Sequence, residues 1–130
     1  MPLASEDGER QQLRVLVVED EMMVALLVRE MLADFGYRVV GPIAQLDRAV
    51  ETARKEAIDV ALLDVNINGR EVYPVATTLT DRGIPFVFVT GYGQAGLRPE
   101  FRACPTLQKP YRPEDLRDII ARVLVASGRG

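Results

Sequence analysis

Apolar residues are concentrated in five short runs along this chain, and between the runs they recur at every third or fourth position. The five runs cover residues 13–18, 37–43, 58–64, 85–90 and 106–109. A short run that is apolar throughout is typical of a β-strand covered on both faces. The run 58–64, with the sequence IDVALLD, is the clearest of these. We expect it to be a buried strand with Asp64 at its carboxyl end.

The stretches between the runs predict amphipathic helices, because their apolar positions share one helical face. The clearest patterns cover residues 24–35, 46–53, 72–79 and 116–123. The stretch 94–102 is the weakest helix candidate, because Gly93, Gly96 and Pro99 oppose or break a helix. We expect a short or mobile element there.

Strands and helices that alternate along a chain form a parallel sheet, with right-handed crossovers and helices on both faces. Five strands fit the flavodoxin-like, doubly wound α/β fold with the strand order 2-1-3-4-5. Ligands bind at the switch point of such a sheet, which lies between the carboxyl ends of strands 1 and 3. Those strands end in Glu19-Asp20 and in Asp64, so the fold class directs attention to these carboxylates.

The composition removes several classes of chemistry. The chain has no histidine, one cysteine (Cys104), and serine only at Ser5 and Ser127. Nucleophile pairs of Ser-His or Cys-His type and the usual Cys/His zinc sites are therefore excluded. A lone cysteine cannot form an internal disulfide, which fits a reducing cytoplasm. We expect a cytoplasmic protein whose chemistry rests on carboxylates, lysine, threonine and an oxygen-preferring cation.

Length and charge limit the domains and partners. The 130 residues predict one domain at 13–127, between a disordered tail at 1–12 and a short tail at 128–130 with no output domain after it. A net charge of −3 with scattered basic residues does not favour nucleic acid. The apolar runs are far shorter than the roughly 20 residues that span a bilayer, so no membrane association is expected.

Polar side chains stand at the carboxyl ends of four predicted strands, namely Glu19, Asp20, Asp64, Thr90 and Lys109. Two carboxylates about 5 Å apart repel by roughly 3 kcal/mol at an effective dielectric near 20, which favours a bound cation such as Mg²⁺. Each residue alone has an ordinary explanation as a strand-end or turn residue. Together they are typical of phosphoryl transfer, with Asp64 as the nucleophile and with Thr90 and Lys109 holding phosphoryl oxygens.

Four short motifs occur at these strand ends: VVEDE at 17–21, LLDVN at 62–66, VTG at 89–91 and KP at 109–110. Together they resemble the receiver domain of two-component response regulators, in the CheY-like superfamily, over residues 13–126. The resemblance implies that Asp64 accepts a phosphoryl group from a phosphohistidine of a sensor histidine kinase. The absence of histidine agrees, because the donor then comes from another protein.

The resemblance also implies the ligands of a magnesium ion and the conformation of one peptide bond. The implied Mg²⁺ ligands are Glu19, Asp20, Asp64 and the main-chain carbonyl of Asn66. Thr90 and Lys109 would contact the phosphoryl oxygens, and the Lys109–Pro110 bond would be cis. One departure concerns the switch aromatic of the family, which lies three residues before the lysine. Thr106 occupies that position here.

The stretch 88–93, FVTGYG, is similar to the signature of the "FAT GUY" single-domain receivers, with Val89 in place of alanine. Regulators of that type are paired with kinases of the HWE or the related HisKA2 class. The resemblance therefore implies such a kinase as one partner and an unidentified downstream protein as another.

These observations predict a stand-alone receiver of a two-component phosphorelay, phosphorylated on Asp64 in a Mg²⁺-dependent reaction and signalling through protein-protein contacts. Such a protein catalyses its own phosphorylation and dephosphorylation but is mainly a switch, and we expect a monomer or weak dimer. The alternative is a pseudo-receiver, a binding module on the same fold that takes no phosphate. A flavodoxin-like cofactor binder is a third hypothesis, but acids after the first strand would repel a phosphate in the absence of metal.

Overall fold

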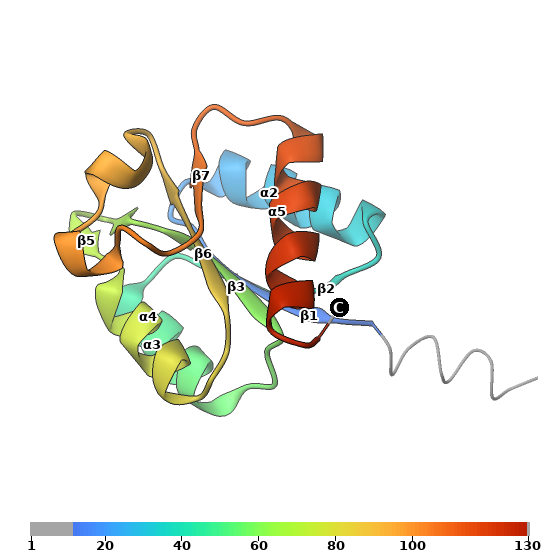
Figure 1. The fold of residues 1–130 in the computed structure, drawn as a ribbon, viewed down its shortest axis with the longest axis horizontal. Helices are drawn as coiled ribbons and strands as arrows, with labels where there is room; N and C mark the ends of the chain where they lie inside the picture. The colour runs from blue at the N-terminus through green and yellow to red at the C-terminus, as the bar shows by residue number, and fades with distance from the viewer. Residues whose placement is uncertain (1–11, 130) are drawn as a thin grey trace, which may run out of the picture.

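A parallel sheet of five strands, in the order β2-β1-β3-β6-β7, forms the centre of the molecule (Figure 1). The strands are β1 (Arg14–Val18), β2 (Arg38–Ile43), β3 (Val60–Asp64), β6 (Phe86–Thr90) and β7 (Thr106–Gln108). In chain order this is 2-1-3-4-5, so the predicted flavodoxin-like α/β fold is confirmed. The structure is a computed structural model that describes residues 12–129. Most of the predicted tail at 1–12, and the last residue of the predicted tail at 128–130, lie outside the described residues.

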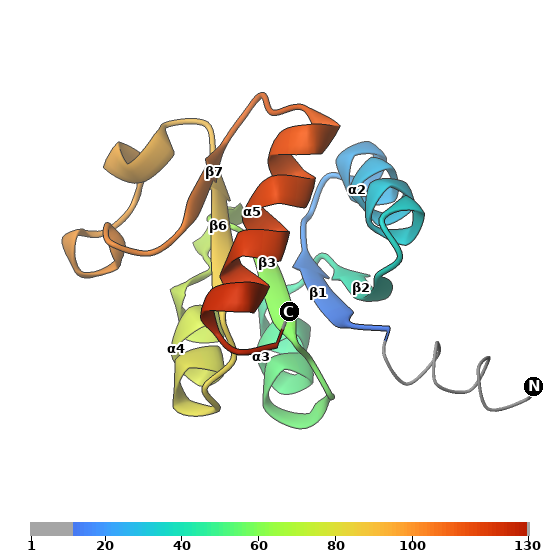
Figure 2. The ribbon, with the colours of Figure 1, turned by 45° about the vertical axis from the view of Figure 1, so that its right-hand side comes forward.

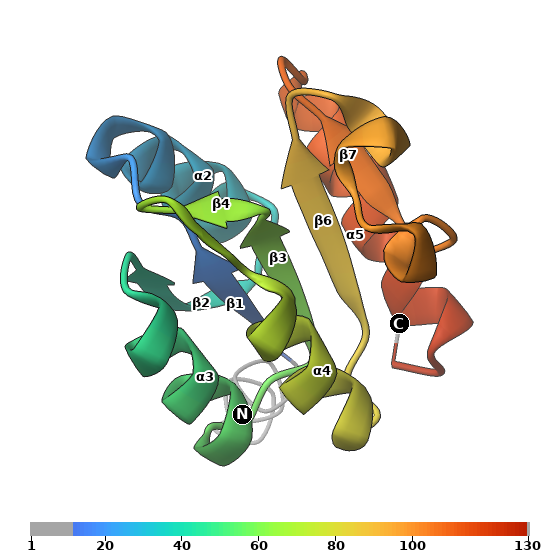
Figure 3. The same cartoon turned by 90° about the vertical axis from the view of Figure 1, so that its left-hand side faces the viewer.

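Two pairs of helices cover the two faces of the sheet (Figure 3). They are α2 (Met22–Asp34) and α5 (Pro113–Ala126) on one face, and α3 (Leu46–Lys55) and α4 (Tyr73–Asp81) on the other. The core accordingly consists of two apolar clusters, and successive residues of β3 contribute to them alternately: Ala61 and Leu63 pack towards α3 and α4, Val60 and Leu62 towards α2 and α5. Burial on both sides explains why the strands are apolar throughout.

The weak helix candidate at 94–102 contains two short 3₁₀ turns, η1 (Gly93–Gly96) and η2 (Pro99–Phe101). Figure 2 shows this segment, in orange, beside β6 and β7 at the edge of the sheet. No residue of either turn is buried. The short element expected from the glycines and Pro99 is therefore confirmed, and four α-helices rather than five surround the sheet in the described part of the chain.

A small hairpin follows β3 that the apolar pattern did not predict. Its strands are β4 (Asn66–Ile67) and β5 (Arg70–Glu71), which pair antiparallel. The two residues between them, Asn68 and Gly69, have φ angles of 53° and 81°. Positive φ at both central residues is the geometry for which Asn-Gly is the favoured dipeptide in two-residue hairpins.

The prolines lie where their missing N–H group is tolerated. Pro42 is in the edge strand β2, as expected, and Pro74 and Pro113 are in the first turns of α4 and α5. Within residues 12–129, none of the helices combines the length and the apolar character that a membrane crossing would require.

Candidate functional site

Three carboxylates meet at the carboxyl edge of the sheet, where β1 and β3 lie side by side. Val18 pairs with Leu63 in the parallel register, so the residues after them in the chain, Glu19 and Asp64, leave the sheet together. One oxygen each from Glu19, Asp20 and Asp64 lies within 4.8 Å of the others. The crowding of acids predicted from the strand order is therefore present.

Glu19 is the most deeply buried of the three, with 6% of its surface exposed. Its Oε2 accepts a hydrogen bond of 3.0 Å from the backbone N–H of Glu21. Burial, aided by the charge of Asp64 and opposed by the Glu21 bond and Lys109, raises the pKa of Glu19 to about 7. The positive charge of Lys109 alone does not offset the cost of burying an ionised Glu19.

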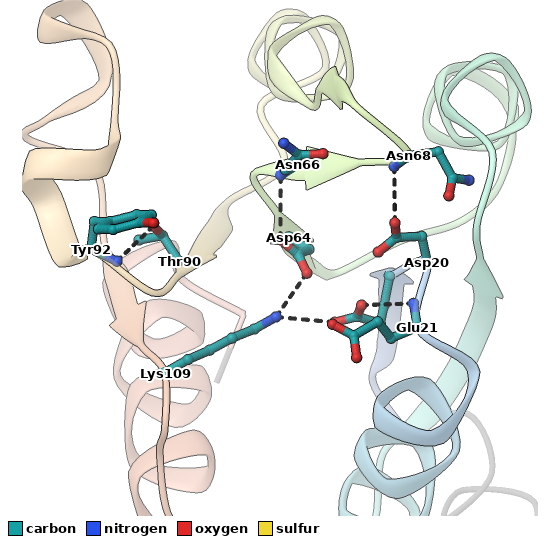
Figure 4. Close-up of polar contacts among 9 residues, drawn as sticks. Asp20, Glu21, Asp64, Asn66, Asn68, Thr90, Tyr92 and Lys109 are labelled. Carbon is teal, nitrogen blue, oxygen red and sulfur yellow. Dashed lines mark hydrogen bonds and ion pairs between the residues drawn. The ribbon is translucent and has the colours of Figure 1, made fainter.

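Lys109 reaches this cluster from the loop after β7. Its Nζ lies 2.9 Å from Asp64 Oδ2 (Figure 4). The same nitrogen lies 3.7 Å from Glu19 Oε1. Burial lowers the pKa of Lys109, but the hydrogen bond to Asp64 and the surrounding carboxylates outweigh it, so the net pKa is raised. The lysine is therefore held in its charged form. The Lys109–Pro110 bond that follows is cis, as the motif predicted.

Asp64 is held on both of its oxygens. While Oδ2 contacts Lys109, Oδ1 accepts a 3.3 Å hydrogen bond from the backbone N–H of Asn66. The side chain of Asn66 turns to the hairpin, where its Oδ1 accepts a 2.9 Å bond from Gly69 N–H. The first turn after β3 is thus closed by the side chains of Asp64 and Asn66, which fixes the direction of the Asp64 carboxylate.

Asn68 was not among the predicted site residues, yet it contacts one of them. Its backbone N–H donates a 2.9 Å bond to Asp20 Oδ2 (Figure 4). Its side-chain Nδ2 donates to the carbonyl of Ala44. The hairpin after β3 therefore holds the side chain of Asp20, which follows the neighbouring strand β1. The Asn-Gly dipeptide was the sequence signal that could have revealed this turn.

Thr90 ends β6 next to β3, where Asp64 pairs with Val89 in the parallel register. It is buried, with 5% exposed, and its Oγ1 accepts a 3.1 Å bond from the backbone N–H of Tyr92. Figure 4 shows this bond on the side of Thr90 away from Asp64. Glu19, Asp20, Asp64 and Lys109 are thus brought together, whereas the hydroxyl of Thr90 is engaged elsewhere.

An apolar groove of about 510 Å³ borders the acidic cluster. Glu21 and Lys109 contribute charged groups to its lining. The apolar part of the lining comes from α2 and from the residues after Lys109: Val24, Leu27, Val28, Met31, Pro110 and Tyr111. Leu27 is itself exposed, and three further apolar side chains of α2 are exposed as well, namely Met22, Met23 and Leu26. Contiguous exposed apolar surface is typical of sites that bind another protein, a ligand or a membrane.

A family model for the response regulator receiver domain matches residues 15–121. The chain belongs to this family. The receiver is 35% identical to SdrG from Sphingomonas melonis Fr1, with 90% of this chain and 97% of SdrG aligned and a TM-score of 0.74. A second SdrG structure is of its BeF₃-activated conformation.

Two further comparisons concern more distant relatives of the receiver. The transcriptional regulatory protein PdtaR of Mycobacterium tuberculosis is 29% identical over 117 residues, and the match covers 89% of this chain but 57% of PdtaR. The receiver domain of the sensor histidine kinase PA1611 from Pseudomonas aeruginosa is 23% identical, with a TM-score of 0.75, over 88% of this chain and 98% of that one. That structure has a magnesium ion coordinated in its active-site cleft. At 23% identity, the comparison shows that the two domains share a fold and nothing more.

The donor set of this receiver fits Mg²⁺. Mg²⁺ is usually bound in proteins by one or two carboxylates together with waters and phosphate oxygens. Carboxylate oxygens of Glu19, Asp20 and Asp64 converge at one point, and the one lysine that contacts the cluster leaves a net negative charge there. A divalent cation would also stabilise the ionised form of Glu19.

Proposed function

We propose that this receiver accepts a phosphoryl group on Asp64 from the phosphohistidine of a sensor histidine kinase, in a Mg²⁺-dependent reaction, and signals through protein contacts. One observation carries the proposal: Lys109 Nζ lies 2.9 Å from Asp64 inside a cluster of three carboxylates. The proposed nucleophile, Asp64, and the lysine ammonium group that would stabilise the phosphorylated product thus lie within hydrogen-bond distance of each other.

The bond changes are those of a phosphoryl transfer. An oxygen of Asp64 forms the new P–O bond while the P–N bond of the donor breaks, and the electron pair of that bond leaves with the imidazole nitrogen. Lys109 binds a phosphoryl oxygen with the ammonium group that now contacts Asp64 Oδ2. The hydroxyl of Thr90 donates to another phosphoryl oxygen. To do so, the Thr90 side chain rotates away from the backbone N–H of Tyr92.

Mg²⁺, when bound, would neutralise the negative charge that Asp64 and the phosphoryl group bring together. The residues that would hold it are Glu19, Asp20, Asp64 and the carbonyl of Asn66. Asn68 keeps Asp20 in place through its backbone N–H, and the Glu21 N–H does the same for Glu19. The same residues serve hydrolysis of the phosphoryl group, so the protein acts as a switch that catalyses its own phosphorylation and dephosphorylation.

The partners follow from the surface and from the motif at 88–93. The exposed apolar side chains of α2 and the groove beside Lys109 support signalling by protein contact. The FVTGYG stretch supports a kinase of the HWE or HisKA2 class as donor, and the downstream protein is unidentified. The scattered basic residues support neither nucleic acid nor a membrane as partner. We place the protein in the cytoplasm as a monomer or weak dimer.

The experiment is phosphorylation by a small phosphodonor with Mg²⁺, followed by intact-mass analysis, and in parallel the binding of beryllofluoride. The wild type is compared with Asp64→Asn and with Asp81→Asn, an exposed aspartate on α4 away from the site. We expect a gain of one phosphoryl group in the wild type and in D81N but none in D64N, and none when EDTA removes the metal. A folded wild type that responds to neither reagent would instead favour the pseudo-receiver.

A further inference from the structure

The edge strand β2 carries one extra residue beside β1. Leu16 pairs with Val40, but Val18, two residues further along β1, pairs with Ile43, three residues further along β2. An extra residue of this kind is a β-bulge, which bends the strand that carries it. The bulge therefore decides which residue of β2 lies beside the end of β1.

Gly41 makes this bulge possible. Its φ is 99°, in the left-handed region that favours glycine. A β-carbon on Gly41 would also lie 2.9 Å from two main-chain atoms, the carbonyl oxygen of Val17 and the nitrogen of Ile43. The main chain cannot turn aside as the end of a flexible side chain can. A side chain at position 41 would therefore force the end of β2 away from β1.

The end of β2 is bonded to the segment that carries two of the three acids. The carbonyl of Ile43 accepts a 3.0 Å bond from the backbone N–H of Glu19. The next carbonyl, of Ala44, accepts a 3.1 Å bond from Asn68 Nδ2. The backbone N–H of Asn68 in turn donates to Asp20 (Figure 4). With the peptide links between residues 19 and 20 and between residues 43 and 44, these three hydrogen bonds close a ring of three chain segments.

Other contacts keep these segments in the fold, but they act at a distance from the acids. Ile43 and Ile67 are buried and anchor β2 and the hairpin in the core. The pairing of β1 with β3 ends at Val18, one residue before Glu19. The bond from Glu21 N–H to the Glu19 carboxylate lies within the same loop and moves with it. The direction of the chain at Glu19 therefore depends on the bond to Ile43.

We propose that the bulge at Gly41 positions the ligands of the divalent cation. The carbonyl of Ile43 acts directly on Glu19, and the next carbonyl acts on Asp20 through the tip of the hairpin. The inference rests on the proposed function, in which these two acids hold Mg²⁺. Gly41 is thus a positioning residue, which acts through the acids and does not itself touch the metal. Loss of a group that orients metal ligands typically lowers the metal affinity about 10- to 100-fold.

The test is Gly41→Ala, with Gly36→Ala as its matched control. Gly36 has a φ of 93°, but a β-carbon there would meet no atom within 4 Å. Both variants place an alanine at positive φ, and only G41A displaces the end of β2. The dissociation constant of Mg²⁺ is measured by NMR titration of backbone amide signals, which also show that each variant is folded. We expect G41A to bind Mg²⁺ about tenfold or more weakly than the wild type, and G36A to bind it equally well.

The outcomes separate this inference from the proposed function. A folded G41A with the Mg²⁺ affinity of the wild type, or equal losses in G41A and G36A, overturns the positioning role and leaves the proposed function intact. A wild type that binds no Mg²⁺ overturns the proposed function and, with it, the positioning role.

A measurement on the wild type decides the question where G41A does not fold. If opening of the β2 end weakens metal binding, bound metal opposes that opening by the same factor. Saturating Mg²⁺ should therefore slow hydrogen exchange of the Glu19 amide about tenfold or more. The control is the Arg38 amide, which bonds to the carbonyl of Leu13 at the other end of the same strand pair and should change much less. Equal changes at the two amides, or no change at Glu19, would overturn the inference.

Discussion

Lys109 and Asp64 form an ion pair of 2.9 Å, and the same ammonium group lies 3.7 Å from the buried Glu19. One cation is therefore shared between the proposed nucleophile and a proposed metal ligand. This arrangement keeps Asp64 oriented before a donor arrives, and it brings a positive charge to the place where phosphoryl oxygens would come to lie.

Replacing this lysine should impair the reaction more than the fold. We expect Lys109→Met to lower the rate of phosphorylation by a small phosphodonor about 100-fold, the typical effect of removing one group that stabilises the transition state. The rate is measured from intact mass at saturating Mg²⁺. Lys55→Met is the matched control, because Lys55 pairs with Glu51 on the exposed side of α3. Equal rates in K109M and wild type would contradict a role for Lys109 in binding the phosphoryl group.

The raised pKa of Glu19 predicts a pH dependence of stability in the metal-free protein. Between pH 4.5 and about 7 the folded state keeps a proton on Glu19 that the unfolded chain has released. Because the folded state binds more protons in this window, the free energy of unfolding should fall as pH rises through it, by at most about 3 kcal/mol. Urea unfolding in EDTA at several pH values measures the fall.

The control for this effect is Glu19→Gln, which cannot titrate and should remove most of the slope. The chain has no histidine, so no imidazole titrates in the same range. Mg²⁺ should reduce the slope in the wild type, because it binds and stabilises the ionised carboxylate. Identical slopes in the wild type and E19Q would show that Glu19 titrates normally in the folded protein.

The fold and the acidic cluster could be predicted from the sequence because both follow from strand order. Parallel strands end at the same edge of the sheet, so the pattern that predicted the order also brought Asp64 beside Glu19 and Asp20. Contacts that depend on loop geometry could not be predicted in the same way. The bond from Asn68 to Asp20 requires a hairpin whose strands have two residues each, too short to give a periodic pattern.

The direction of the Thr90 side chain could not be predicted from the sequence either. Nothing in the motif at 89–91 indicates that the Thr90 hydroxyl accepts from Tyr92 on the side away from Asp64. That orientation results from the path of the chain after β6, where Gly96 approaches Thr90. The glycines at 93 and 96 predicted a weak helix correctly, but the reason for Gly96, which is space beside Thr90, appears only in three dimensions.

Arg82, which lies away from the acidic cluster, should contribute to the stability of the fold. Its Nη1 donates to the carbonyls of Ala53 and Glu56, at 2.6 and 2.8 Å, and so joins the end of α4 to the end of α3. Because the side chain is exposed, we expect Arg82→Ala to lower the free energy of unfolding by about 1 kcal/mol, measured in urea. Arg48→Ala, on the exposed side of α3, should cost little by comparison. A loss in R82A no larger than in R48A would contradict this bridge.

Asn68 should matter both for its conformation and for its side chain. Its φ of 53° is left-handed, which costs about 1–2 kcal/mol for a residue such as alanine but little for glycine. Asn68→Ala should therefore destabilise the protein in urea more than Asn68→Gly, although both lose the bond to Ala44. Since the backbone N–H that holds Asp20 is retained in both, N68G should keep near-normal Mg²⁺ affinity. Equal losses of stability in the two variants would show that the side-chain bond, and not the backbone conformation, is the reason for asparagine at this position.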